Sequence, residues 1–342
     1  MTVDIFYSKK FIFHRKGKII MNTLALVVPC FNEQDVIAMF YDEVSKVTSS
    51  LSAEYSTEIV FVDDGSSDNT LKLIKDLALR DPMVKYISFS RNFGKEAAML
   101  AGMNYAVKAD FIGIMDADLQ HSPDLIPQML DYVTAGGYDV AAARRSDRDG
   151  ENKFKSFLSQ SFYKVINKIS DTKISESAQD FRIMKSSVVK AILTMPEKIR
   201  FSKGIFSWVG FNVKWIDHAN RERAAGQTKW SVSKLMKYAV DGILGFTSFP
   251  LRISFFVSAL FAFCSLAGLI YALIRNIINS DYICSMPLTL AAIFFVGAGI
   301  CVSLGILGEY ISRVYTEVKD RPEYVIAQTN TRNKFYGTEG AE

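Results

Sequence analysis

Two long apolar segments near the end of the chain constrain its fold more than any other feature. Residues 253–274 form a run of 22 positions without a charge, and residues 282–308 form another of 27. A helix rises about 1.5 Å per residue, so each run is long enough to cross a hydrocarbon core about 30 Å thick. A buried hairpin of a soluble protein is the alternative. We expect two transmembrane helices within residues 250–308.

Charged residues flank these segments asymmetrically. Lys237 and Arg252 precede the first run, Arg313 and Lys319 follow the second, and the connector at 275–281 is nearly neutral. Positively charged flanks favour the cytoplasmic side of a membrane. The sequence therefore predicts a multi-pass protein whose two termini both lie in the cytoplasm.

The segment before the first apolar run, residues 231–249, has the pattern of an amphipathic helix. At helical spacing, one face carries apolar side chains: Val232, Leu235, Ala239, Ile243 and Phe246. The opposite face carries charged ones: Lys234, Lys237 and Asp241. Such a helix can lie in a membrane interface or dock on a soluble domain. We expect the interface, because the spans begin directly afterwards.

The first 220 residues alternate short β-rich runs with helix-length amphipathic segments. The runs are LALVVP, TEIVFV, VKYISF, FIGIM and YDVAAA. Alternation of this kind predicts an α/β domain with a mostly parallel sheet, here over residues 22–230. Such sheets bind ligands in the crevice at the carboxyl ends of their strands.

The net charge of +4 comes from the beginning of the chain. Residues 1–20 alone carry Lys9, Lys10, Arg15, Lys16 and Lys18 against Asp4. The remainder is neutral, so the folded body lacks the basic balance of a nucleic-acid-binding protein. Residues 1–21 have no long apolar core and are not a secretory signal. They form a basic extension, either a membrane-touching arm or the product of a misplaced start before Met21.

The four cysteines have no paired spacing typical of zinc sites or disulfide frameworks. They are Cys30, Cys264, Cys284 and Cys301, and three of them lie in apolar runs. We expect small buried apolar side chains in a reducing compartment.

Polar residues follow several of the predicted strands. VVPCFNEQ ends one strand and presents Asn32 and Glu33, and FVDDGSSDNT ends the next with Asp63 and Asp64. Because the carboxyl ends of parallel strands meet at one edge, we expect these loops to meet. Asp68 or Ser67 could equally serve only as a cap for the following helix.

The segment MDADLQH is the sharpest of these signals. Asp116 and Asp118 follow a buried strand, and Gln120 lies beside them. Two carboxylates so close repel each other unless a cation or a proton lies between them. Mg²⁺ typically takes one or two carboxylates together with substrate phosphates. Asp116, Asp118 and Gln120 are therefore predicted to hold Mg²⁺ or Mn²⁺.

Together these motifs resemble the family 2 glycosyltransferases with a GT-A fold. VVPCFNEQ, VDDGSSDNT, SRNFGKEAAMLAG, MDADLQHSPDLIP, QDFRIM and RERAAGQTKWSVSKL occur in the expected order. FSKGIFSWVGF, SFPLRI and LGILGEYISRVYTEVKDRPEYVI, together with two spans, resemble more narrowly the bacterial polyprenyl-phosphate glycosyltransferases, especially the bactoprenol glucosyltransferases of O-antigen modification. The resemblance covers residues 22 to about 326, and residues 309–342 are read as a cytoplasmic tail.

The resemblance implies roles for individual residues. Those expected to hold the nucleotide are Pro29, Phe31, Glu33, Val62 and Asp64. Those expected to contact the donor and the metal are Asp116, Ala117, Asp118 and Gln120. Arg145, Arg223 and Lys229 match phosphate-contacting positions of the related dolichyl-phosphate mannose synthases, with Arg145 on the donor side. Asp180 would face the sugar in the place of a catalytic base.

The activity that this resemblance implies is transfer of one sugar, with inversion, to undecaprenyl phosphate at the inner membrane. UDP-glucose is the favoured donor, and some relatives form tetramers. A processive glycan synthase is the first alternative, but it normally has more spans and a Gln-x-x-Arg-Trp motif, where this chain has QTKW at 227–230. The second alternative is a non-catalytic membrane scaffold with a degenerate nucleotide fold, against which the complete set of acidic residues argues.

Overall fold

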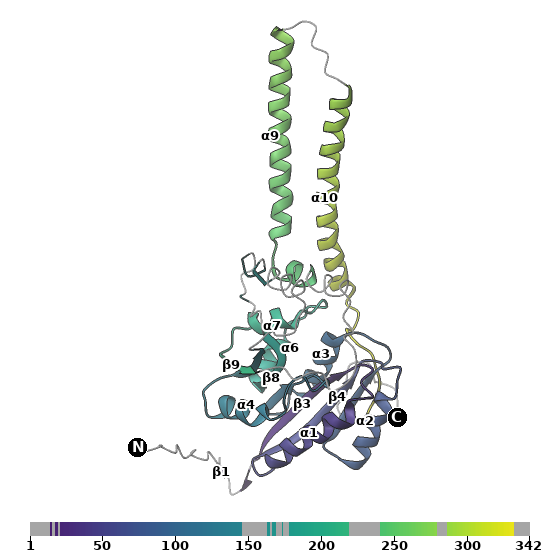
Figure 1. Ribbon diagram of the computed structural model, residues 1–342, viewed down its shortest axis with the longest axis vertical. Helices are drawn as coiled ribbons and strands as arrows, with labels where there is room; N and C mark the ends of the chain where they lie inside the picture. Colours follow the sequence, from purple (N-terminus) through teal and green to yellow (C-terminus); the bar gives the residue numbers. More distant parts are fainter. Residues whose placement is uncertain are drawn as a thin grey trace, which may run out of the picture.

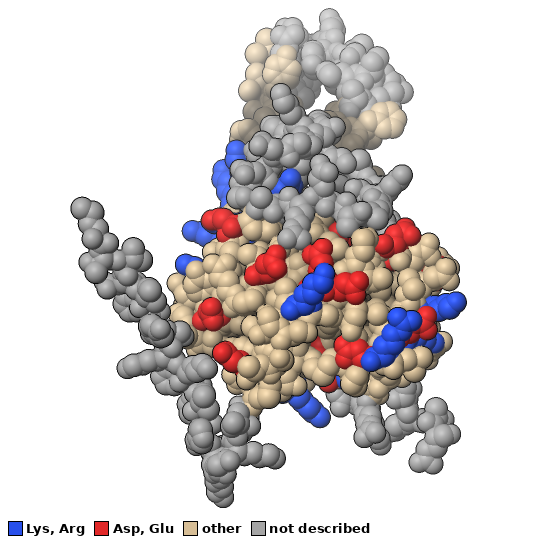
Figure 2. Space-filling view, turned by 60° about the horizontal axis from the view of Figure 1, so that its bottom comes forward, with Lys and Arg blue, Asp and Glu red and all other residues tan. Residues whose placement is uncertain are grey.

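The structure is a computed structural model that describes residues 14–15, 18–19, 21–145, 163–164, 166–168, 173, 178–218, 240–278 and 286–331. Figure 1 shows an α/β domain from which two long helices rise side by side. On the face in Figure 2, acidic side chains are spread over this domain with basic ones among them. The predicted α/β class with two apolar helices behind it is confirmed.

The α/β domain is built on an eight-stranded sheet with the order β10-β5-β4-β3-β6-β8-β7-β9. Its strands are β3 (Asn22–Cys30), β4 (Tyr55–Asp63), β5 (Val84–Phe89), β6 (Phe111–Ile114), β7 (Val140–Arg145), β8 (Ala178–Lys185), β9 (Val213–His218) and β10 (Ile326–Thr329). Neighbours from β5 to β6 are parallel, as are β7 and β9, whereas β8 and β10 run antiparallel to their partners. The sheet is thus mostly parallel, as predicted. A separate antiparallel pair, β1 (His14–Arg15) and β2 (Lys18–Ile19), precedes it.

Helices cover both faces of this sheet, which explains why its central strands are apolar throughout. On one face lie α1 (Ile37–Ser50), α2 (Thr70–Arg80) and α4 (Leu125–Thr134), packed on the Leu24, Leu26 and Val28 side of β3. On the other lie α3 (Lys95–Ala106), α6 (Ser186–Leu193) and α7 (Ser202–Trp208), packed on the Ala25 and Val27 side. A Cβ on Gly102 of α3 would lie 2.1 Å from Val27 Cγ1, so a glycine is needed for this close approach.

The two apolar helices are α9 (Phe249–Ile278) and α10 (Met286–Lys319). Both are long and apolar enough to cross a membrane, and the apolar windows within them are unburied. They contact each other at Gly299, where an added Cβ would collide with the Phe261 ring. Cys264 and Cys301 lie exposed on these helices, so the expectation of buried cysteines is correct for Cys30 and wrong for these two. Cys284 lies outside the described residues.

The segment after α10 returns to the sheet and is not merely a tail. β10 pairs with β5, and the Ser90 amide donates to the Val325 carbonyl at 2.9 Å. The Tyr324 ring stacks on Phe89 with centroids 5.1 Å apart. The predicted boundary at residue 309 therefore separates a sheet strand from its domain. This boundary was not predicted correctly because a four-residue edge strand has too few residues to show a clear apolar alternation.

The described part of the amphipathic segment docks on the α/β domain. Residues 240–246 are helical, and Ile243 and Phe246 pack against a cluster that contains Phe201. On the polar side, Arg313 of α10 donates to Asp241 at 2.7 Å. These residues therefore contact the α/β domain and α10, and the predicted position of the segment in the membrane interface stays a prediction. Residues 231–239 lie outside the described residues.

Candidate functional site

The loops that follow β3 and β4 are joined by hydrogen bonds. The Asn32 amide donates to Ser66 Oγ at 2.9 Å, and Asn32 Oδ1 accepts from the Ser67 amide at 2.8 Å. The Glu33 amide donates to Thr70 Oγ1 at 2.7 Å. Two motifs that lie far apart in the sequence thus form one rim at the carboxyl ends of adjacent strands, as the alternation of strands and helices predicts.

Asp64 connects this rim to the loop that precedes α3. Its carboxylate accepts from the Phe93 amide at 2.6 Å and from the Gly94 amide at 2.9 Å. Burial raises the pKa of Asp64 to about 6, although these two amides oppose the rise. Gly65 has φ +67°, and a Cβ there would meet the Arg91 backbone at 2.4 Å. In this structure Asp64 therefore orders the loop beside the site, and its predicted contact with a nucleotide stays a prediction.

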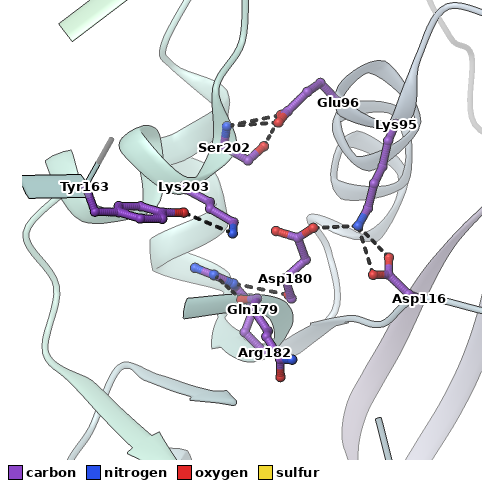
Figure 3. A network of polar contacts seen from close by, with 9 residues as sticks. All are labelled: Lys95, Glu96, Asp116, Tyr163, Gln179, Asp180, Arg182, Ser202 and Lys203. Atoms are coloured by element: carbon purple, nitrogen blue, oxygen red, sulfur yellow. Dashed lines mark hydrogen bonds and ion pairs between the residues drawn. The ribbon is translucent and has the colours of Figure 1, made fainter. Parts of the chain in front are cut away.

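Lys95 lies at the centre of the site, between two carboxylates (Figure 3). Its ammonium lies 2.7 Å from Asp116 Oδ1 and also pairs with Asp180 Oδ2. Burial alone would lower the pKa of Lys95, but the charges of Asp116 and Asp180 raise it above its ordinary value. Of the two aspartates in the MDADLQH segment, Asp116 thus has a lysine of the same chain as its partner, and this lysine also pairs with Asp180.

The sequence contains a signal for Lys95 that motif reading missed. Lys95 is the first residue of α3, directly after Gly94. The amino end of a helix carries partial positive charge, so a cation is disfavoured there. A lysine at this position needs nearby carboxylates, and their presence could have been inferred from the strand ends.

Asp180 projects from β8 toward Lys95, as Figure 3 shows. Arg182, two residues further along β8, donates to the backbone oxygens of Gln179 and Asp180. The guanidinium also lies 3.7 Å from the centre of the Phe206 ring. Burial tends to raise the pKa of Asp180, yet Lys95 and then Lys203 lower it below its usual range. Asp180 is therefore ionised.

Asp118 and Gln120 lie in the loop after β6, where the Gln120 amide donates to Asp118 Oδ1 at 3.2 Å. Among the described residues there is no group of three or more His, Cys, Asp or Glu side chains that could enclose a metal ion. Asp116 and Asp118 nevertheless provide hard oxygen donors, and Mg²⁺ is commonly held by one or two carboxylates plus substrate phosphates. The donor set fits a cation shared with a phosphorylated ligand.

His121, which follows this loop, has a structural role. It is 5% exposed, its ring stacks on Phe181, and its Nδ1 lies 3.2 Å from His218 Nε2. Burial lowers the pKa of His121 to about 4. The ring is therefore neutral near pH 7 and joins the loop after β6 to the end of β9.

Some of the remaining residues predicted to bind the donor lie at the rim, and others lie away from it. Pro29 and Val62 are register partners on β3 and β4, Phe31 follows β3, and Ala117 is buried after β6. Arg145 ends β7, which two strands separate from β3 in the sheet. Arg223 and Lys229 lie outside the described residues.

Comparison with known proteins agrees with this arrangement. Residues 25–193 match the family model "Glycosyl transferase family 2". The chain is 39% identical to "Putative glycosyltransferase CsbB" of Bacillus subtilis, over 91% of this chain and 93% of that one. It is 41% identical to "Prophage bactoprenol glucosyl transferase homolog" of Escherichia coli, over 89% and 98%. "Bactoprenol glucosyl transferase" of Shigella phage SfV is 39% identical, over 89% and 97%.

A mostly parallel sheet with acidic loops at its strand ends is the architecture of a nucleotide-sugar transferase of the GT-A type. The chain belongs to glycosyl transferase family 2. Within the family it is similar, over most of its length, to proteins named bactoprenol glucosyl transferase. The resemblance stated from the motifs is thereby confirmed.

Proposed function

We propose that this protein is a membrane-bound transferase that moves one glucose from UDP-glucose to undecaprenyl phosphate. The observation that carries the proposal is the Asp116–Lys95–Asp180 cluster, placed at strand ends in a domain that leads into two apolar helices. The names of the relatives support a glucosyl donor and a bactoprenol acceptor. Such an acceptor keeps its chain in the bilayer, which explains why the catalytic domain and the helices belong to one chain.

On the donor side, Asp116 and Asp118 would hold a divalent cation, with Gln120 nearby. When bound, such a cation neutralises charge that develops on the leaving diphosphate. The rim formed by the loops after β3 and β4 would bind the nucleoside, with Pro29, Phe31 and Val62 against it. Lys95 would keep Asp116 and Asp180 from repelling the anionic donor.

On the acceptor side, a phosphate oxygen would attack the anomeric carbon while the bond to the diphosphate breaks. The electron pair of that bond leaves with UDP, and attack from the opposite face inverts the anomeric centre. A phosphate monoester has its second pKa at about 6, so near pH 7 its oxygen is already anionic. Asp180, held ionised by Lys95, would therefore position the reacting groups more than it removes a proton.

We further propose that the α/β domain and both termini are cytoplasmic, since nucleotide-sugars occur there and the positive flanks agree. Residues 1–21 would form a basic extension and residues 22–230, with β10, the catalytic domain. Bacterial inner membrane is the expected location. A tetramer remains a prediction from the resemblance.

The test is transfer of labelled sugar by the purified full-length protein in nanodiscs that contain undecaprenyl phosphate. A panel of UDP-sugars with Mg²⁺, Mn²⁺ or EDTA should give a single glucosyl lipid product from UDP-glucose only when metal is present. A polymeric product would indicate a processive synthase. Binding of UDP without any turnover would indicate the non-catalytic scaffold.

A further inference from the structure

A second lysine lies on the other side of Asp180. Lys203 is in the first turn of α7, and in Figure 3 its ammonium and that of Lys95 lie on opposite sides of the Asp180 carboxylate. Lys203 Nζ donates to the Tyr163 hydroxyl at 3.4 Å. The cluster thus alternates in charge from Asp116 through Lys95 and Asp180 to Lys203. No sequence motif assigned a role to this lysine.

The position of Lys203 is fixed by the same helix that carries Lys95. Glu96, the next residue of α3, accepts from the Ser202 amide at 3.1 Å and from the Ser202 hydroxyl. Each lysine is thus a sequence neighbour of one of the two residues in the Glu96–Ser202 contact, which joins the beginning of α3 to the beginning of α7. This link holds the two ammonium groups on separate sides of Asp180, so they can serve two different ligands.

α7 also faces the membrane helices. A Cβ on Gly204 would lie 2.5 Å from the Phe246 ring, so α7 packs closely on the helical residues 240–246. Phe246 is three positions before Phe249, where the first candidate span begins. Figure 1 places α7 on the side of the domain from which α9 and α10 rise. Lys203 is therefore at the membrane-facing side of the site, whereas Asp116 is at the strand ends.

We propose that Lys203 binds the phosphate of the lipid acceptor and brings it against Asp180. The proposal rests on the function proposed above. A phosphate monoester carries a charge of about −1.5 to −2 at pH 7, and the ionised Asp180 would repel it without a nearby cation. The ammonium of lysine is a compact point charge suited to phosphate. Lys95, engaged by Asp116, stays on the donor side.

Substitution with a matched control tests this assignment in full-length protein in phosphatidylcholine nanodiscs. Lys203→Gln should raise the apparent KM for undecaprenyl phosphate about tenfold or more, because it loses one charged hydrogen bond. The KM for UDP-glucose and the Kd of UDP should stay within about twofold of wild type. Lys203→Arg should restore most of the lipid affinity. The control is Lys190→Gln, which removes an exposed lysine from α6 and should change neither constant.

A second measurement uses the wild-type protein and does not depend on the folding of a variant. Reductive methylation of lysines, read by mass spectrometry, should be slowed at Lys203 by undecaprenyl phosphate. Undecaprenol, which lacks the phosphate, and phosphatidylglycerol should give no protection. Protection by UDP alone would move Lys203 to the donor site and overturn the proposal.

Two outcomes separate this inference from the proposed function. If wild type transfers glucose to undecaprenyl phosphate but Lys203→Gln leaves the lipid KM unchanged, only the role of Lys203 is wrong. A Lys203→Gln variant with a shifted pH profile and a normal lipid KM would show that Lys203 acts only on Asp180. If wild type transfers no sugar to the lipid, the proposed function itself fails.

Discussion

Replacing Lys95 by glutamine tests whether its ammonium occupies part of the space that a divalent cation needs. Glutamine keeps a hydrogen-bond donor, on a side chain one bond shorter, but removes the charge. The change leaves Asp116 and Asp180 without the cation that lies between them in this structure. The surrounding carboxylates should therefore attract an added metal ion more strongly, while turnover falls.

The magnitude follows from the geometry of Asp116. A metal ion lies about 2.1 Å from a carboxylate oxygen, and Lys95 Nζ lies 2.7 Å from Asp116 Oδ1. An ion that shares this oxygen is therefore within about 5 Å of the ammonium. Even the dielectric constant of water, which gives the smallest value, makes the repulsion about 2 kcal/mol. Lys95→Gln should bind Mn²⁺ roughly tenfold or more tightly.

The assay is titration with Mn²⁺ by electron paramagnetic resonance, with no nucleotide present. Lys72→Gln, which removes an exposed lysine from α2, is the control and should match wild type. Glucose transfer by Lys95→Gln should fall at least about tenfold, since an oriented charge at the reacting centre is lost. Unchanged or weaker Mn²⁺ binding in Lys95→Gln would refute the reasoning.

Three further outcomes are expected. Asp118→Ala should fold normally and lose about a hundredfold or more in turnover; near-normal activity, or full wild-type activity in excess EDTA, would exclude its role. In a cysteine-free background, Asn279→Cys should react with an impermeant thiol reagent added to spheroplasts and Lys319→Cys should not; the reverse pattern would put the catalytic domain outside. His121, with its pKa lowered by burial to about 4, binds its proton first in the unfolded chain, so its contribution to stability is lost as pH falls from about 6.5 toward 4. His121→Gln should remove about 2 kcal/mol of the loss between pH 7 and 5, measured by thermal unfolding in nanodiscs; an unaltered pH dependence would contradict this.

The sequence predicts those strands whose own residues show the apolar pattern of a buried strand. β3 and β4 are apolar along their length because helices cover both faces of the sheet. β8, whose sequence is AQDFRIMK, carries three charged residues, of which Arg182 is buried. Burial of Arg182 is stabilised by hydrogen bonds to two backbone carbonyls and by its contact with the Phe206 ring. Because this ring comes from α7, the local sequence of β8 could not predict the contact.

The sequence predicted the acidic loops of the candidate site. It did not predict that lysines lie among the carboxylates and balance their charge. The spacing of Asp116 and Asp118 alone predicts that a cation lies near them, and a metal ion is the cation that this spacing suggests. Lys95 is 21 positions before Asp116, and Asp180 is 85 positions after Lys95. The pairing of β3 with β6 and of β6 with β8 brings Asp116 and Asp180 together, and the packing of α3 on β3 places Lys95 between them.

The alternation of charge across the site is well suited to a reaction between two anions. The proposed donor brings a diphosphate and the proposed acceptor a phosphate, and each would be repelled by a site made only of carboxylates. A site made only of cations would bind both but would also hold the diphosphate product. In the proposed assignment, Lys95 and Lys203 on opposite sides of Asp180 would give each anion its own cation and keep a negative charge between them. We expect that negative charge, where the sugar ring passes, to be the part of the cluster that favours the positively charged transition state over either bound substrate.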